Sequence, residues 1–214
     1  MTFRCRGVRV TLSFWFFCGA VLLLSADRSG TAGLFFWAIA LHEGGHLLYL
    51  RLARLPVGEL RLSPLGLLLS LSAGCHPGPG QSLLLNLSGC AANLTAAALL
   101  PLLPGGGMAA LRFSAVNTAL GVLNLLPVPG LDGAQALEDL LVLLLGWQRG
   151  TALHSALMRG ICLAGTAGCG WLLITRGFRL PLLCFWLIFF TALLEPIQNL
   201  PARRLDGDFF VPLR

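Results

Sequence analysis

The sequence contains no lysine and few charged residues of any kind. Its 15 basic residues are all arginine, and charged side chains make up only 11% of the 214 residues. Soluble globular domains carry about a quarter. Hydrophobic residues account for 56% of the chain, and the mean hydropathy is +0.80. These values exclude an ordinary soluble domain and predict an integral membrane protein.

The sequence also lacks a basic patch and paired cysteines. The net charge of +6 comes from arginines at the ends of apolar segments, where membrane topology places them, so nucleic acid is not expected as a partner. The seven cysteines include no Cys-x-x-Cys pair and mostly lie within apolar runs. We interpret them as small buried residues, and not as a disulfide framework or a second metal site.

Six apolar segments have the length or position of membrane-spanning helices, and polar or glycine- and proline-rich turns separate them. Their approximate ranges are 10–26, 32–52, 82–103, 108–147 with a break at 124–133 and helix again over 134–147, 158–175, and 180–197. The first segment follows three arginines but no convincing cleavage site, so we expect a retained helix instead of a signal peptide. The sequence therefore predicts an all-α polytopic membrane protein with about six transmembrane helices and a broken fourth helix.

Residues 56–71 are too short and too interrupted to span a membrane. Polar and apolar positions alternate from Gly58 to Ser63, and a second extended run ends at Leu71. This pattern favours a small membrane-associated β element, such as a hairpin, after the second helix, with an irregular interfacial loop as the alternative. Because an open strand edge cannot face lipid, we expect this element at the surface or against a protein cavity.

An HExxH pattern, His42-Glu43-Gly44-Gly45-His46, lies inside the second apolar segment. Two histidines four residues apart share one helix face and can reach the same metal ion, and Glu43 is close enough to act on a metal-bound water. Ionisable residues are costly at membrane depth, so they mark functional sites there. The pattern predicts two ligands and a base of a zinc hydrolase.

A catalytic zinc needs a third protein ligand. Asp132 is preferred, because it lies in the helix break on a segment that topology returns to the same leaflet, and Gly133 permits a close backbone approach. Three other candidates are weaker. We expect His76 and His154 to be solvated, and Glu195, near the end of the last segment, to snorkel or cap a helix.

We therefore predict that His42, His46 and Asp132 hold one Zn²⁺ and that Glu43 is the catalytic base for hydrolysis of a peptide bond. Asn93 and Asn124 also lie at membrane depth and are candidates for binding a substrate strand or stabilising an oxyanion. The alternative for each asparagine is an interhelical hydrogen bond that only packs the helices together.

Three motifs, at residues 42–46, 89–93 and 124–133, occur in the same order as in the site-2 proteases, which are intramembrane zinc metalloproteases. The sequence resembles this family, and most closely the group typified by stage IV sporulation protein FB. Gly89-Cys90-Ala91-Ala92-Asn93 resembles the GPxxN element of that family, and the segment 124–133 resembles its NxxPxPxxDG motif. The resemblance covers about residues 9–146. Two positions depart from the family pattern: Cys90 stands where proline is usual, and Ala134 replaces a glycine often found after Asp-Gly.

The resemblance implies a zinc metalloendopeptidase that cleaves a transmembrane or membrane-associated protein in the cell membrane of a bacterium. The sequence is interpreted as one transmembrane protease domain over residues 1–200, with its core at 9–146, and a short polar cytoplasmic tail over 201–214. The arginine distribution places both termini in the cytoplasm. The oligomeric state stays open, and so does the question of whether the protein acts in sporulation.

Two other classes of protein compete with the protease. A catalytically inactive relative would bind membrane partners without cutting them, but the intact set of His42, Glu43, His46 and Asp132 disfavours it. A metal transporter would need a chain of acidic residues through the apolar segments, and the sequence has none.

Overall fold

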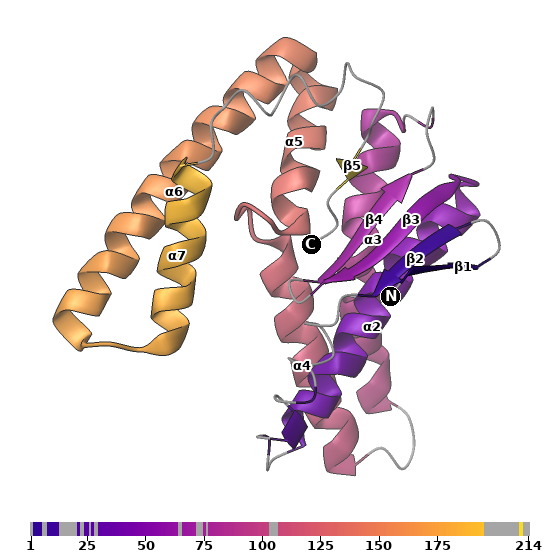
Figure 1. Ribbon diagram of the computed structural model, residues 1–214, viewed down its shortest axis with the longest axis horizontal. Helices are drawn as coiled ribbons and strands as arrows, with labels where there is room; N and C mark the ends of the chain where they lie inside the picture. Colours follow the sequence, from indigo (N-terminus) through magenta and orange to yellow (C-terminus); the bar gives the residue numbers. More distant parts are fainter. Residues whose placement is uncertain are drawn as a thin grey trace.

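A computed structural model describes residues 2–5, 8–12, 21, 24–25, 27, 30–63, 66–71, 75, 77–102, 107–194 and 210–211. Helices dominate it, and a small sheet lies on one side (Figure 1). The helices are α2 (Thr31–Leu52), α3 (Pro79–Leu99) with a 3₁₀ turn η1 (Leu100–Leu102), α4 (Gly107–Leu125), α5 (Asp132–Leu145), α6 (Trp147–Arg176) and α7 (Leu180–Leu194). The strands are β1 (Thr2–Cys5), β2 (Val8–Leu12), β3 (Val57–Ser63), β4 (Gly66–Leu71) and β5 (Phe210–Val211).

The five strands form one sheet in the order β1-β2-β3-β4-β5. β3 and β4 pair antiparallel, which confirms the hairpin predicted within residues 56–71. β2 lies parallel to β3, and a parallel pair needs a long crossover, which here contains α2. β5 comes from the predicted polar tail and pairs antiparallel with β4. Its neighbours in the tail lie outside the described residues.

Apolar contacts fix the sheet to the helices. Leu50 at the end of α2, Leu71 in β4 and Leu85 near the start of α3 are buried against one another. Burying such a side chain contributes roughly 1.5–3 kcal/mol. The hairpin is therefore anchored where α2 and α3 meet.

α2 and α3 cross closely at two glycines. A Cβ on Gly45 would lie 2.6 Å from the carbonyl oxygen of Ser88 and 3.1 Å from the Cα of Gly89. Small residues allow two helix backbones to approach in this way. The crossing places the HExxH motif of α2 directly against α3.

The break after α4 occurs where the sequence predicts it. α4 ends at Leu125 and α5 begins at Asp132, and two prolines and a glycine with φ 89° lie between them. α5 packs on α3 on one side and on α6 on the other. Figure 1 shows α6 and α7 as a hairpin on the side of α5 away from the sheet.

In the described part of the chain, three helices are long and apolar enough to cross a membrane: Pro79–Leu102, Gly107–Leu125 and Trp147–Arg176. A shorter apolar helix covers Leu182–Leu194. α2 has 22 residues but carries His42, Glu43 and His46, which lower its hydropathy. The three apolar helices support a membrane protein, whereas the number of six spans stays a prediction.

The predicted first span, residues 10–26, is wrong at its beginning. Val10, Thr11 and Leu12 belong to β2, because β-branched residues suit a strand and β3 offers a backbone partner. Residues 13–20 of that span lie outside the described part of the chain.

The predicted span over residues 158–175 begins too late. α6 starts at Trp147, directly after Gly146, whose φ of 78° turns the chain. Arg149 and His154 interrupt the apolar pattern of residues 147–157, so hydropathy alone did not predict a membrane-spanning helix there.

Candidate metal centre

Three side chains from two separate parts of the chain meet where α2, α3 and the start of α5 converge. His42 and His46 come from α2, and Asp132 is the first residue of α5. Their exposed fractions are 4%, 1% and 1%. These residues form a group whose ligand atoms all lie within 4.8 Å of one another.

The distances within this group suit one metal ion. His42 Nε2 lies 2.9 Å from Asp132 Oδ2, and His46 Nε2 lies 3.2 Å from the same oxygen. The two Nε2 atoms are 3.2 Å apart. Ligand atoms about 2.0–2.1 Å from a tetrahedral zinc ion are separated by about 3.4 Å, so the three atoms are spaced as a ligand set.

Two further observations agree with a metal at this point. Asp132 Oδ1 is buried and has no hydrogen-bond partner among the described residues. Burying a polar atom in this way is costly unless something binds it. In addition, a Cβ on Gly89 would lie 2.8 Å from His42 Nε2 and would also overlap His46 Nε2. The glycine thus keeps the faces of both imidazoles clear.

The hydrogen bonds of His42 leave its Nε2 available as a ligand. Asn93 Nδ2 donates to the carbonyl oxygen of Ala38 at 3.1 Å and to Asn117 Oδ1 at 3.0 Å, so its Oδ1 acts as an acceptor. His42 Nδ1, 3.0 Å from that oxygen, therefore carries the proton and donates it. This places the lone pair of the neutral ring on Nε2, facing Asp132.

His46 is oriented in the same way by α3. Its Nδ1 donates to the carbonyl oxygen of Leu85 at 2.8 Å, and Ser88 Oγ lies 3.2 Å from that nitrogen. Since a carbonyl only accepts hydrogen bonds, His46 Nδ1 carries a proton, and the tautomer that can bind a metal has its lone pair on Nε2. Both histidines thus present Nε2 toward Asp132, the orientation that two metal ligands would need.

The start of α5 is fixed by close packing. A Cβ on Gly133 would overlap the carbonyl groups of Leu125 and Leu126 at the end of α4, so only glycine fits there. Asn86 Nδ2 of α3 donates to Asp139 Oδ2 of α5 at 2.9 Å, and both residues are buried. These contacts hold Asp132 against the histidines.

Cys90, at the position where the resemblance expects proline, lies beside Asp132. Its Sγ is 3.9 Å from Asp132 Oδ2, and the residue is 1% exposed. The departure from the family pattern therefore falls next to the ligand set.

Glu43 and Asn124 complete the residues predicted for catalysis. Glu43 follows His42 on α2 and is half-buried. Asn124 is 6% exposed, and its Nδ2 donates to the carbonyl oxygen of Leu120 at 3.1 Å. The other amide hydrogen of Asn124 has no partner among the described residues. Asn93, in contrast, uses both amide hydrogens within the bundle and has none left for a substrate.

His154 does not join the metal group, but the expectation that it is solvated is wrong. It is 7% exposed in α6, and its Nδ1 lies 3.9 Å from Glu138 Oε2 of α5. The reason is close packing between the two helices, because a Cβ on Gly150 would lie 2.6 Å from the backbone nitrogen of Val142. His76 and Glu195, the other weak candidates, lie outside the described residues.

Sequence reasoning missed Asn117, Ser88 and the pair of Asn86 and Asp139. One signal for Asn117 was present: it is a polar residue in an apolar helix, seven positions before Asn124 and thus on the same helix face. Ser88 and Asn86 carried no comparable signal, because serine and asparagine near the start of a helix are also common on exposed surfaces.

The fold is similar to that of a solved protein. No protein-family model and no curated protein sequence matches the chain. The structure of a site-2 protease from Methanocaldococcus jannaschii matches with a TM-score of 0.59 and 20% sequence identity. The match covers 91% of this chain and 94% of that protein. At this identity the likeness shows that the two chains share a fold.

Proposed function

We propose that this chain is an intramembrane zinc metalloendopeptidase of the site-2 protease type. It hydrolyses a peptide bond in a transmembrane or membrane-associated protein and holds one Zn²⁺. The observation that carries the proposal is the convergence of His42 Nε2, His46 Nε2 and Asp132 Oδ2 within 3.2 Å of one another. The shared fold with a site-2 protease supports it.

The residues of the site have separate roles in this reaction. His42, His46 and Asp132 hold the metal, which, when bound, acidifies water and polarises a peptide carbonyl. Glu43 accepts a proton from the attacking water at its carboxylate and donates it to the nitrogen of the leaving amine. Asn93 holds the ring of His42 in place.

Asn124 is proposed to contact the substrate. Asn124 follows Asn117 by seven residues, so both lie on the buried face of α4. One amide hydrogen of Asn124 bonds to Leu120, and the second is available on this face. A donor at this place suits the carbonyl oxygen of an extended substrate, or the oxyanion that forms when water attacks it. Burial strengthens such a hydrogen bond, because water does not compete for it.

The proposal includes a topology. Six spans with both termini in the cytoplasm place the end of α2 and the start of α5 in the cytoplasmic half of the membrane. Residues 1–200 then form one protease domain, with residues 201–214 as its tail. Substrates that fit this placement are a sporulation pro-sigma factor, as for the stage IV sporulation protein FB group, an anti-sigma factor, or a remnant signal peptide.

The test combines metal content with cleavage. The purified full-length chain is assayed for zinc by mass spectrometry and is co-expressed with tagged candidate substrates, whose cleavage is followed as a gel shift. Glu43→Gln is expected to retain zinc and to lower cleavage by about 10²–10⁴-fold. Glu138→Gln, the same substitution on α5, serves as the matched control and is expected to cleave normally.

The result also separates the protease from an inactive relative. A chain that contains zinc but cuts none of the candidates at a rate above Glu43→Gln is a binding protein with this fold. A purified chain without zinc, or a Glu43→Gln variant as active as the parent, overturns the proposed chemistry.

A further inference from the structure

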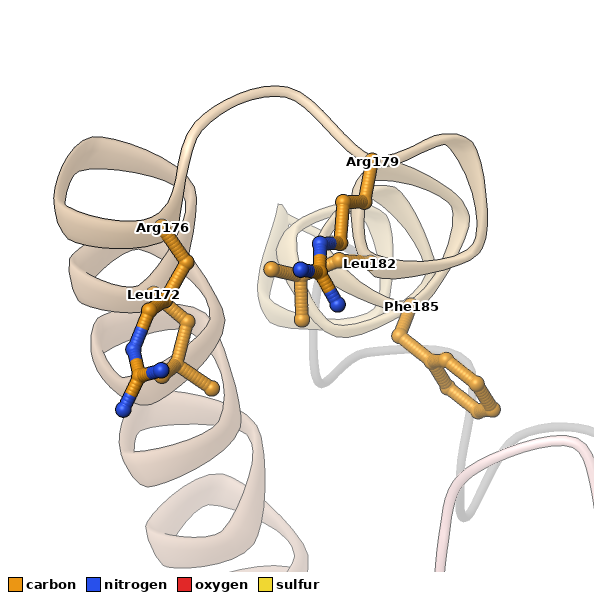
Figure 2. Close-up of a pocket in the computed structure, with 5 residues that line it drawn as sticks. All are labelled: Leu172, Arg176, Arg179, Leu182 and Phe185. Carbon is orange, nitrogen blue, oxygen red and sulfur yellow. The ribbon is translucent and has the colours of Figure 1, made fainter.

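A hollow lies far along the chain from the metal centre, between α6 and α7 near the turn that joins them. It has a volume of about 490 Å³ and is lined by Leu172, Arg176, Arg179, Leu182 and Phe185 (Figure 2). Small-molecule sites usually measure about 300–1,000 Å³. The hollow is thus large enough for part of a ligand, and its walls are apolar except for two arginines.

Among the residues that the structure describes, the two arginines carry positive charge without a matching acid. Arg176 ends α6, and Arg179 directly precedes α7. Both are exposed, and neither forms an ion pair with any residue in the described part of the chain. A guanidinium binds phosphate oxygens through two parallel hydrogen bonds, so a pair of arginines suits a phosphate group.

Both arginine side chains line the hollow. Figure 2 shows that both run from the turn back along the helices, beside Leu172 and Leu182. An arginine that only marks the end of a span would extend toward water. Here the charged groups lie next to apolar surface, where a bound anion compensates them most effectively.

The turn also has the features of a membrane interface. α6 is apolar and long enough to cross a membrane, and Arg176 is its last residue. Trp171 and Phe178, on either side of that end, are 68% and 74% exposed. Aromatic residues gather at the depth of the lipid headgroups. This arrangement suits a position of the two arginines at the level of lipid phosphates.

Close helix packing forms the hollow as part of the hairpin. A Cβ on Gly165 would lie 2.6 Å from the ring of Phe189, and one on Gly170 would lie 3.3 Å from Trp186 Nε1. These glycines bring α6 and α7 together farther from the turn. Gly177, with φ 78°, then reverses the chain. The hollow lies between this turn and the close contacts at Gly165 and Gly170.

We propose that this hollow binds an anionic phospholipid, with its phosphate on Arg176 and Arg179 and an acyl chain against Leu172, Leu182 and Phe185. Leu172 and Phe185 are 42% and 46% exposed, which is the apolar surface an acyl chain would cover. A free phosphate ion would use the charge but not these walls. The inference stands apart from the proposed protease activity, because it involves none of the residues of the metal centre.

The experiment measures lipid retained by the purified full-length chain. The protein is incorporated into nanodiscs of phosphatidylcholine with one-fifth phosphatidylglycerol, transferred to neutral detergent, and analysed by native mass spectrometry. The parent is expected to retain phosphatidylglycerol in preference to phosphatidylcholine. Arg176→Gln/Arg179→Gln is expected to lower its affinity about 30-fold, since each arginine near an anionic lipid contributes a factor of about five.

Two controls make the test decisive. Arg149→Gln/Arg159→Gln removes the same charge from the other half of α6 and is expected to retain the lipid as the parent does. Leu182→Trp fills the hollow without changing charge and is expected to release the lipid. Equal retention by all variants, equal retention of the two lipids, or displacement by inorganic phosphate alone overturns the proposal.

Discussion

Asn86 Nδ2 donates a hydrogen bond to Asp139 Oδ2 at 2.9 Å, and the two residues are 1% and 3% exposed. Asp139 follows Asp132 by seven residues, so both carboxylates lie on one face of α5. Asn86 is next to Leu85, whose carbonyl oxygen orients His46. The pair therefore links the helix that carries Asp132 to the helix that positions the histidines.

Removing one member of this pair should weaken the fold and the metal site together. Asn86→Leu takes a donor from a buried carboxylate, and we expect it to lower the free energy of unfolding by about 2 kcal/mol. The double variant Asn86→Leu/Asp139→Leu replaces both partners by apolar groups and should be closer to the parent. Unfolding in mixed detergent micelles measures the free energy of unfolding of both variants and of the parent. A double variant less stable than the single one would contradict this role.

Gly89→Ala should remove the metal while the fold persists. The added methyl group would overlap His46 Nε2 and lie 2.8 Å from His42 Nε2, the two ligand nitrogens. We expect zinc affinity, measured by competition with a chelator, to fall by at least about tenfold. Gly80→Ala is the matched control on α3, because nothing lies within 4 Å of a Cβ there. Equal affinities of the two variants would mean that Gly89 is not a wall of the site.

Asn93→Leu should weaken metal binding through His42. The substitution removes the oxygen that accepts the proton of His42 Nδ1, and loss of such a partner typically costs about 10–100-fold in metal affinity. Asn93→Asp keeps an oxygen for His42 but loses the donors to Ala38 and Asn117. If zinc affinity depends on the hydrogen bond to His42, Asn93→Asp should bind zinc more tightly than Asn93→Leu. Titration of both variants with zinc measures this difference.

Removal of the metal should destabilise the parent and leave Asp132→Ala unchanged. A ligand present at 1,000 times its dissociation constant stabilises the folded state by about 4 kcal/mol. We therefore expect a chelator to lower the thermal unfolding temperature of the parent in detergent. Asp132→Ala lacks one of the three proposed ligands. We therefore expect its unfolding temperature to be low without the chelator and unchanged when the chelator is added. A chelator effect of equal size in both would place the metal elsewhere.

The sequence by itself determined the features that depend on neighbours along the chain. The spacing of His42 and His46 puts both on one helix face, the prolines and glycines before Asp132 end a helix, and alternation over residues 57–71 makes a hairpin. Each follows from backbone geometry within a few residues. For this reason the shared helix face of the two histidines, the broken helix and the hairpin could be predicted without a structure.

Only the tertiary structure decided how distant residues meet. The bond from His42 to Asn93 joins positions 51 apart, and that from Asn86 to Asp139 joins positions 53 apart. Neither spacing repeats a helix or strand period. The burial of His154 and the pairing of β2 with β3 likewise depend on a partner element that local pattern does not reveal. Two of these cases depend on helix crossings at glycine, which fix how closely two backbones approach: Gly45 lies against α3 beside the pair of His42 and Asn93, and Gly150 lies against α5 beside His154.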